Sequence, residues 1–225
     1  MIAPTESADP TAGMEPEGTG SEGTGSEGMG PEGMGPEGMG PEGMGPEGIE
    51  PDDKDWTWVL QRACPDCGFD ARTVSGRQVA AQLRANASRW PAVFERADVT
   101  ARPQPLVWSP LEYGCHVRDV CRLFESRLKL MRLQVDPAFE NWDQDATAIA
   151  DAYGAQDPAA VSRELSAAAE SAAAAFDDVG QGDWARTGRR SNGSVFTIET
   201  LGQYFLHDVT HHLHDVTHHL HDVHG

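Results

Sequence analysis

Three things are scarce in this sequence of 225 residues: long apolar runs, basic residues and cysteine. Because no stretch of 18 apolar side chains is present, we expect no membrane-spanning helix. Because the formal net charge is −19, we expect no general affinity for nucleic acid. The start of the sequence also shows neither the basic nor the apolar part of a secretory signal, which predicts a cytoplasmic protein.

Cysteine occurs only four times and at irregular spacing, which is too little for the disulfide framework of a small secreted domain. The sequence also shows no Ser-His-Asp pattern and no signature of a catalytic cysteine. We expect the four residues to be reduced thiols: Cys64, Cys67, Cys115 and Cys121.

The first 55 residues lack aromatic side chains and carry one basic residue, Lys54, against 14 acidic ones. They hold 14 of the 24 glycines and 8 of the 15 prolines, and residues 14–53 form eight units of five residues. Such a composition cannot bury enough apolar surface to offset the entropy of ordering. We therefore predict a disordered, acidic Gly/Pro/Glu-rich tail over residues 1–55. It is either a partner-binding or solubilising arm, or a repeat expansion without a dedicated role.

The remaining residues, 56–225, predict one folded domain with four stretches of helical periodicity. Ser109 and Glu112 form a capping box with Pro110 at the first helical position. Pro91 is expected to kink or restart the first helix. An all-α, four-helix-bundle domain is indicated by the predicted helices, about 77–96, 109–133, 157–180 and 197–213, and by the long connection 135–156.

Nine histidines are present, and eight of them lie in the last nineteen residues. The exception, His116, falls on the second predicted helix among Tyr113, Val120, Leu123 and Phe124, on the face that should turn inward. A buried imidazole needs a partner for each ring nitrogen, and a hydrogen-bonding group or a metal ion can provide it. His116 is therefore either a satisfied core histidine or a metal ligand.

His207 and His211 are four residues apart on the last predicted helix, a spacing that lets two imidazoles share one cation. Together with His116 they would give a three-nitrogen site with coordination positions left for water or substrate. The pair faces away from the apolar side of its helix. Either the helix is covered on both sides, or the pair is exposed.

The unit HDVTHHL occupies residues 207–213 and again residues 214–220. Because a copy of seven residues keeps each side chain on nearly the same face, His214 and His218 reproduce the geometry of the first pair. Beside the five-residue repeats of the tail, this copy indicates slippage in the coding sequence rather than a second designed site. Which copy is used stays open at this stage.

Two segments, WSPLEYGCHVRD at 108–119 and YFLHDVTHHL at 204–213, resemble the DinB/YfiT-like superfamily. Three shorter segments look like an actinobacterial branch of it: 55–60, 64–70 and 139–145. The resemblance covers about residues 56–213. It implies a four-helix bundle with a divalent metal on three histidines, one from the second helix and an HxxxH pair from the fourth. The implied ligands are His116, His207 and His211, with zinc or nickel as the metal.

Cys64-Pro-Asp-Cys67 is half of a zinc-binding pattern, which becomes a strong signal only when a second pair follows at suitable spacing. Cys115 and Cys121 do not supply that pair, because they point to different sides of one predicted helix. The sequence leaves open a structural zinc site, a redox pair or a structured turn.

Two further groups could serve a site near the metal. Arg186, Arg189 and Arg190 precede the last helix, and they either receive an anionic substrate or thiol cofactor or form a solvated surface. Asp143 and Asp145 could reach the mouth of a cleft or orient a ligand histidine.

The resemblance implies the fold more strongly than the reaction, since function lies in the site. The superfamily includes thiol-dependent enzymes, among them mycothiol-dependent maleylpyruvate isomerase and bacillithiol transferases. The first hypothesis is a metal-dependent enzyme that holds a low-molecular-weight thiol as thiolate for attack on a small-molecule electrophile. The alternative is a non-catalytic, metal-binding bundle that acts as a stress-response or interaction module. A homodimer is compatible with either hypothesis.

Overall fold

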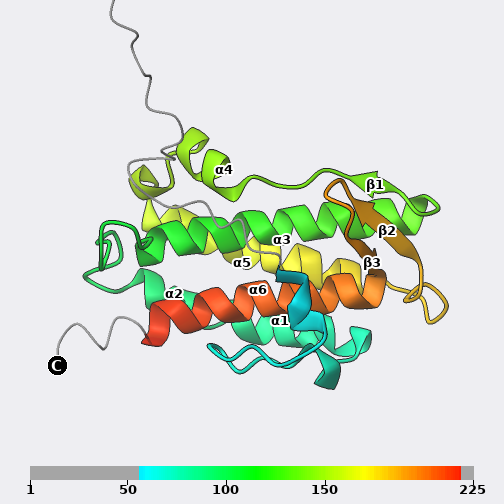
Figure 1. Ribbon diagram of the computed structural model, residues 1–225. Coiled ribbons are helices and arrows are strands. Elements are labelled where there is room, and N and C mark those ends of the chain that lie inside the picture. Colours follow the sequence, from blue (N-terminus) through cyan, green and yellow to red (C-terminus); the bar gives the residue numbers. More distant parts are fainter. Residues whose placement is uncertain (1–55, 219–225) are drawn as a thin grey trace, which may run out of the picture. The chain divides into compact units, whose positions relative to one another are not determined.

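The computed structural model describes residues 56–218 of the chain (Figure 1). The predicted acidic tail, residues 1–55, and the end of the repeated heptad, residues 219–225, lie outside the described residues. Most of the described chain is helical, and a small three-stranded sheet accompanies the helices. Among the described helices, none combines the length and the apolar character that crossing a membrane requires.

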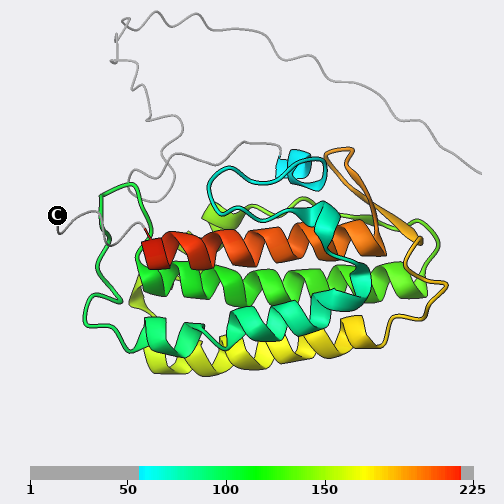
Figure 2. The ribbon, with the colours of Figure 1, turned by 90° about the horizontal axis from the view of Figure 1, so that it is seen from below.

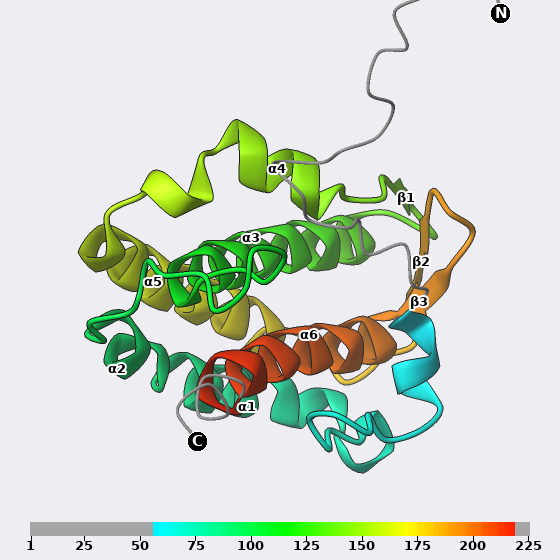
Figure 3. The ribbon, with the colours of Figure 1, turned by 60° about the vertical axis from the view of Figure 1, so that its left-hand side comes forward.

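Four helical units form the bundle, and they agree with the four predicted spans. The first unit is interrupted at Pro91, as expected of a proline that can only sit in a first helical turn. Helix α1 packs against α5 and α6, and α3 also packs against α5 and α6 (Figure 3). The first unit and α3 therefore lie mostly across the bundle from each other, as do α5 and α6, whereas the consecutive helices α3 and α5 are neighbours. The units are α1 (Val79–Ala87) with α2 (Trp90–Phe94), α3 (Pro110–Leu133), α5 (Pro158–Asp177) and α6 (Ile198–His218).

Side chains just before the long helices fix where those helices begin. The Ser109 N–H donates to Glu112 Oε2 at 2.8 Å, and the Glu112 N–H donates to Ser109 Oγ at 3.3 Å. This is the predicted capping box. The Asp157 carboxylate accepts from the Ala160 N–H at 2.9 Å. Because the box sets the start of α3, it also sets the face on which His116 lies, two turns later.

Helices α3 and α6 run antiparallel along a shared aromatic seam. Phe124 of α3 stacks on Phe205 of α6 with ring centroids 4.9 Å apart. His116, earlier in α3, meets His212, later in α6, with centroids 4.6 Å apart. The first half of α3 therefore faces the second half of α6.

A small sheet departs from the all-α expectation. It consists of β1 (Ala138–Phe139), β2 (Thr187–Arg190) and β3 (Val195–Thr197), with β1 parallel to β2 and β2 antiparallel to β3. The hairpin turns at Asn192-Gly193, where Gly193 has φ +94°, a conformation that favours glycine. The connection after α3 also contains a short helix, α4 (Gln144–Ala150), which Asp143 caps by accepting from the Ala146 N–H at 2.8 Å.

Residues 56–78 form a segment of short 3-10 turns that lies along α6 (Figures 1 and 2). We call it the N-terminal segment. Val59 and Ala71 are fully buried and anchor it. The Gln203 side chain of α6 donates to the Val74 carbonyl oxygen at 2.7 Å. Helix α6 is thus covered on both sides, by the bundle and by this segment. The turns are η2 (Trp56–Leu60), η3 (Ala71–Thr73) and η4 (Gly76–Gln78).

Candidate metal centres

Residues 207–212 of α6, HDVTHH, contain two pairs of potential ligands, each spaced by four residues. Successive residues of an α-helix are about 100° apart, so the two pairs face different sides of α6. His207 and His211 face the N-terminal segment, whereas Asp208 and His212 face α3. Each pair meets further ligands there, and two separate groups result.

The first group, which we call the α3–α6 group, consists of His116, Asp208 and His212. His116 Nε2 lies 3.5 Å from Asp208 Oδ1, and His212 Nε2 lies 3.7 Å from the same oxygen. One ligand atom from each residue lies within 4.8 Å of the others. Two imidazoles and a carboxylate are a common donor set for catalytic zinc and related metals.

The protonation states and burial of this group fit a divalent cation. His116 Nδ1 is buried without a hydrogen-bond partner among the described residues, and His116 Nε2 and Asp208 Oδ1 have only long contacts, 3.5 Å with each other and 3.7 Å from that oxygen to His212. A buried polar group left unpaired costs about 1–3 kcal/mol. Burial lowers the pKa of His116. Burial alone would raise the pKa of Asp208, but the imidazoles of His116 and His212 bring it below its ordinary value. Neutral imidazoles and an ionised carboxylate are the metal-binding forms.

Aromatic rings enclose the α3–α6 group. Trp142, from the connection before α4, stacks on His116 with ring centroids 5.2 Å apart. Trp108 lies 5.3 Å from the same imidazole, and Tyr113 lies 5.3 Å from that of His212. A small apolar pocket adjoins these rings and offers a recess beside the group. It is lined by Pro103, Val107, Trp108, Pro110, Tyr113 and Val216, and by one charged residue, Asp215.

Asp215, from the repeated heptad, lies between the two groups. Its Oδ2 is 3.4 Å from His212 Nδ1 and 3.8 Å from His211 Nε2. A carboxylate in this position orients a metal-binding histidine through the nitrogen that does not bind the metal. The copied pair behaves differently: the two rings stack on each other at 4.2 Å, and within the described chain they join no group of three potential ligands. These residues are His214 and His218.

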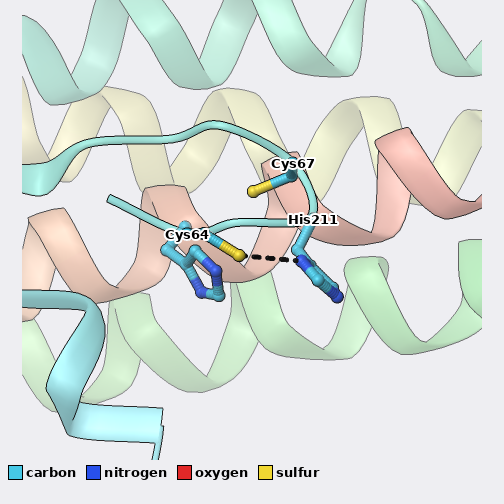
Figure 4. A group of neighbouring side chains, drawn as sticks. Cys64, Cys67 and His211 are labelled. Atoms are coloured by element: carbon cyan, nitrogen blue, oxygen red, sulfur yellow. Dashed lines mark hydrogen bonds between the residues drawn. The ribbon is translucent and has the colours of Figure 1, made fainter. Parts of the chain in front are cut away.

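The second group, which we call the Cys–His group, consists of Cys64, Cys67, His207 and His211. One ligand atom of each lies within 4.8 Å of the others. Cys64 Sγ is 3.7 Å from His211 Nδ1, and Figure 4 shows both thiols and this ring turned toward a common centre. The cysteines belong to a tight turn in which the Gly68 N–H donates to the Cys64 carbonyl oxygen at 3.0 Å.

Burial controls ionisation in the Cys–His group. It lowers the pKa of His207 to about 4 and that of His211 below its ordinary value, so both imidazoles are neutral at neutral pH. It raises the pKa of Cys67 to about 11. The imidazoles are therefore ready to bind a metal, whereas this thiol must release a proton when it does so.

The three histidines implied by the resemblance fall into both groups. His207 and His211 lie together, as their spacing predicts, and His207 is only 4% exposed because the N-terminal segment covers it. His116 is fully buried, but it meets Asp208 and His212 instead of that pair. One ion held by all three histidines stays a prediction. Asp208 and His212 are not among the residues expected from the sequence, although they share the same four-residue spacing.

A buried arginine follows the α3–α6 group along the aromatic seam. Arg127 is 6% exposed, its Nη2 donates to the Glu140 carbonyl oxygen at 2.8 Å, and its Nε has no partner among the described residues. Its guanidinium lies over the rings of Phe124 and Phe139, at 5.4 and 4.9 Å. Burial lowers its pKa to about 10, and the nearby Arg190 acts in the same direction. Arg127 is still a cation at neutral pH, and two neighbouring guanidinium groups favour an anion.

The three arginines considered either as an anion site or as a solvated surface have different surroundings. Arg186 donates to two carbonyl oxygens at the end of α3. Arg189 pairs with Asp136 at 2.7 Å. Arg190 lies 5.8 Å from the Tyr204 ring of α6 and is the one that neighbours the buried arginine. Asp143 and Asp145, expected near a ligand histidine, join neither group of ligands in the described part of the chain.

The family model of the DinB superfamily matches residues 81–216, which is more than half of the chain. The chain therefore belongs to the DinB superfamily. Among solved structures it is similar to YfiT from Bacillus subtilis, described as a probable metal-dependent hydrolase with an unusual four-helix bundle topology. The two share 17% sequence identity with a TM-score of 0.55, over 68% of this chain and 88% of that one. At this identity the likeness concerns the fold. No curated protein matches the chain significantly.

Proposed function

We propose that the protein is a divalent-metal-dependent enzyme whose metal is held by His116, Asp208 and His212. The observation that carries this proposal is the enclosed group of three ligands whose buried His116 and Asp208 atoms find no hydrogen-bond partner among the described residues. Three protein ligands leave coordination positions open, as in catalytic rather than structural sites. Zinc or nickel suits this donor set. The description of YfiT as a probable metal-dependent hydrolase supports the same class.

In this proposal the nucleophile is a low-molecular-weight thiol and not a protein side chain. Cys115 and Cys121 lie near His116 on α3, but burial raises the pKa of Cys115 to about 12 and raises that of Cys121 as well. Neither residue is a thiolate at neutral pH. A bound metal supplies Lewis acidity that lowers the pKa of a coordinated thiol. The resulting reaction class is transfer of the thiol to a small electrophile, or a thiol-dependent isomerisation.

Residues around the α3–α6 group would orient such reactants. The small, mostly apolar pocket beside Trp108 and Tyr113 would contact an apolar part of the electrophile at its mouth. Burial raises the pKa of Tyr113, so its hydroxyl stays protonated and can donate a hydrogen bond. Arg127 and Arg190 suit an anionic group, such as a carboxylate of the thiol or of the substrate.

The test is an assay of the full-length protein, loaded with zinc or nickel, on an activated haloarene. The assay is run with mycothiol, with bacillithiol and without thiol. We expect thiol-dependent turnover that falls by roughly 100-fold or more in His116→Ala and in Asp208→Asn, since loss of a ligand exceeds the effect of losing its supporting groups. His214→Ala serves as the control and should keep the activity. Turnover without thiol would indicate hydrolysis instead. Tight metal binding without turnover would favour the non-catalytic bundle.

Two further variants, His212→Ala and His207→Ala, separate two ligand sets for His116. If the ion sits on His116, Asp208 and His212, then His212→Ala abolishes turnover and His207→Ala retains the metal of this group. If the ion sits on His116, His207 and His211, as the resemblance implies, the two variants exchange their effects. His116→Ala is inactive in both cases, so the comparison of His212→Ala with His207→Ala distinguishes the two ligand sets.

A further inference from the structure

We propose that Cys64, Cys67, His207 and His211 form a four-ligand zinc site that fastens the N-terminal segment to α6. This inference goes beyond the proposed function and shares no ligand with the α3–α6 group. Two thiolates and two imidazoles make the Cys₂His₂ set of structural zinc sites. The cysteine pair comes from a turn, and the histidine pair that completes it comes from a helix more than 130 residues later.

The distances are close to those of a tetrahedral site. With zinc–sulfur bonds of about 2.3 Å and zinc–nitrogen bonds of about 2.0–2.1 Å, the ligand atoms of a tetrahedron lie roughly 3.3–3.8 Å apart. Cys64 Sγ and His211 Nδ1 are 3.7 Å apart, and all four ligand atoms lie within 4.8 Å of one another. Small side-chain shifts therefore bring the four atoms around one ion.

The group is enclosed and has an unpaired polar atom. Cys64 is 1% exposed and His207 is 4% exposed. His207 Nε2 is buried without a hydrogen-bond partner among the described residues, and a metal would satisfy it. Trp56 covers both rings, with centroids 5.6 Å from His207 and 5.4 Å from His211. Four protein ligands under such a cover leave no position for a substrate, which indicates a structural role.

The N-terminal segment needs such a fastening, because its loop has little else to hold it. Of residues 61–70, only Cys64 is fully buried, and the partly buried ring of Phe69 also packs against the core. The loop closes through the Cys64 N–H, which donates to the Phe69 carbonyl oxygen at 2.9 Å. With one fully buried side chain and one partly buried ring, the loop gains limited stability from apolar burial, and binding of a metal would add to it.

The test is a titration of the full-length, reduced, metal-free protein with Co²⁺, followed by displacement with Zn²⁺. We expect sulfur-to-cobalt charge-transfer absorption that saturates at one equivalent of thiolate-bound ion. The His-rich end has no thiol, so ions that bind there give no such band. At one equivalent of Co²⁺ the band should be strongly weakened in Cys64→Ser and in His207→Ala, because each variant loses one of the four ligands. It should persist in the matched cysteine control Cys121→Ala and in His116→Ala.

A second measurement, made on the parent protein, tests the proposal even if the variants fail to fold. In the parent protein, zinc should slow the reaction of Cys67 with a thiol reagent by at least tenfold, and a chelator should reverse this. Three outcomes overturn the proposal: Co²⁺ bound without the charge-transfer band, a full band in His207→Ala, or a Cys64–Cys67 disulfide that forms equally fast with and without zinc. A variant of the α3–α6 group that loses enzymatic activity should keep the charge-transfer band. The proposed function and the structural zinc site can therefore be disproved independently of each other.

Discussion

At the scale of single residues, neighbours on α6 serve different partners. Asp208 and His212 face α3, while His207 and His211 face the N-terminal segment. Because successive residues of an α-helix are rotated by about 100°, adjacent side chains of α6 face different elements, α3 on one side and the N-terminal segment on the other. Substitutions one residue apart should therefore have separable effects, which is unusual for a histidine-rich stretch.

Nearby tryptophans allow the groups to be observed independently. Trp142 stacks on His116 at 5.2 Å, and Trp56 lies 5.4 Å from His211. Paramagnetic Ni²⁺ or Co²⁺ should quench the indole closest to it. Because Trp108 lies as close to His116 as Trp142 does, we expect the double variant Trp108→Phe/Trp142→Phe to lose the quenching that His116→Ala also loses, and Trp56→Phe to lose most of the remainder. Titration of these variants with Ni²⁺ or Co²⁺, followed by tryptophan fluorescence, measures the quenching. Equal loss of quenching in both tryptophan variants would contradict two separate groups.

Asp215 predicts a link between the groups. Its carboxylate lies 3.4 Å from His212 Nδ1 and 3.8 Å from His211 Nε2. Asp215→Asn should lower metal affinity about 10- to 100-fold in both groups, because the histidines lose the carboxylate that orients them. Competition with a chelator of known affinity measures this effect. His214→Gln, a substitution in the same heptad, should leave both affinities unchanged. If it weakens them as much, the cause is general damage to the end of α6.

At the scale of elements, the sequence predicts the long helices well because their signals are local. Ser109, Pro110 and Glu112 lie within four residues, and α3 begins where they indicate. The sheet has no such signal. Strand β1 has two residues, and Ala138 pairs with Arg189, far along the chain. The turn residues are visible in the sequence, but a strand of three or four residues is too short for an alternating pattern to stand out.

The candidate sites show the same limit. The burial of His116 follows from the apolar neighbours on its own helix, which are local. The residues that the α6 histidines contact depend on the N-terminal segment, which covers a helix that begins about 120 residues further along the chain. In the sequence, Cys64 and Cys67 therefore form only half of a zinc-binding pattern. The fold brings the other half, His207 and His211, next to them. Periodicity gives the face of a side chain but not its partner.

The capping box of α3 predicts a dependence of stability on pH. Burial alone would raise the pKa of Glu112, but the Arg102 guanidinium and the Ser109 N–H hold it below its ordinary value of 4.5. Since the pKa is lower in the folded state, this contribution is complete above pH 4.5 and is lost as the pH falls below it. Glu112→Gln should therefore lower the free energy of unfolding by about 1–3 kcal/mol at pH 7 and by much less near pH 3. Urea unfolding at both pH values measures this. An equal difference at both would show that the carboxylate charge is not involved.

At the scale of the whole molecule, the bundle encloses one continuous apolar core to which α3, α5 and α6 all contribute. The stripe expected on α3 included Leu123, which is only partly buried, whereas Leu128 and Met131 are fully buried. The apolar arc is thus rotated slightly from the expected one, because α6 and α5 both press on α3 and the core side lies between them. His116 remains on the α6 side of that arc.

A shared core predicts that cavities in different helices cost similar amounts. Leu128 of α3 and Leu165 of α5 are both 0% exposed. Leu128→Ala and Leu165→Ala should each lower the free energy of unfolding by about 2–5 kcal/mol, since each removes buried methyl groups and leaves a cavity. Leu133→Ala, at a site 83% exposed on the same helix as Leu128, should cost less than about 0.5 kcal/mol. Urea unfolding measures all three, with the same dependence on urea concentration expected for each variant. A large cost at Leu128 with a small cost at Leu165 would mean that α5 does not share the core that positions α3 and its histidine.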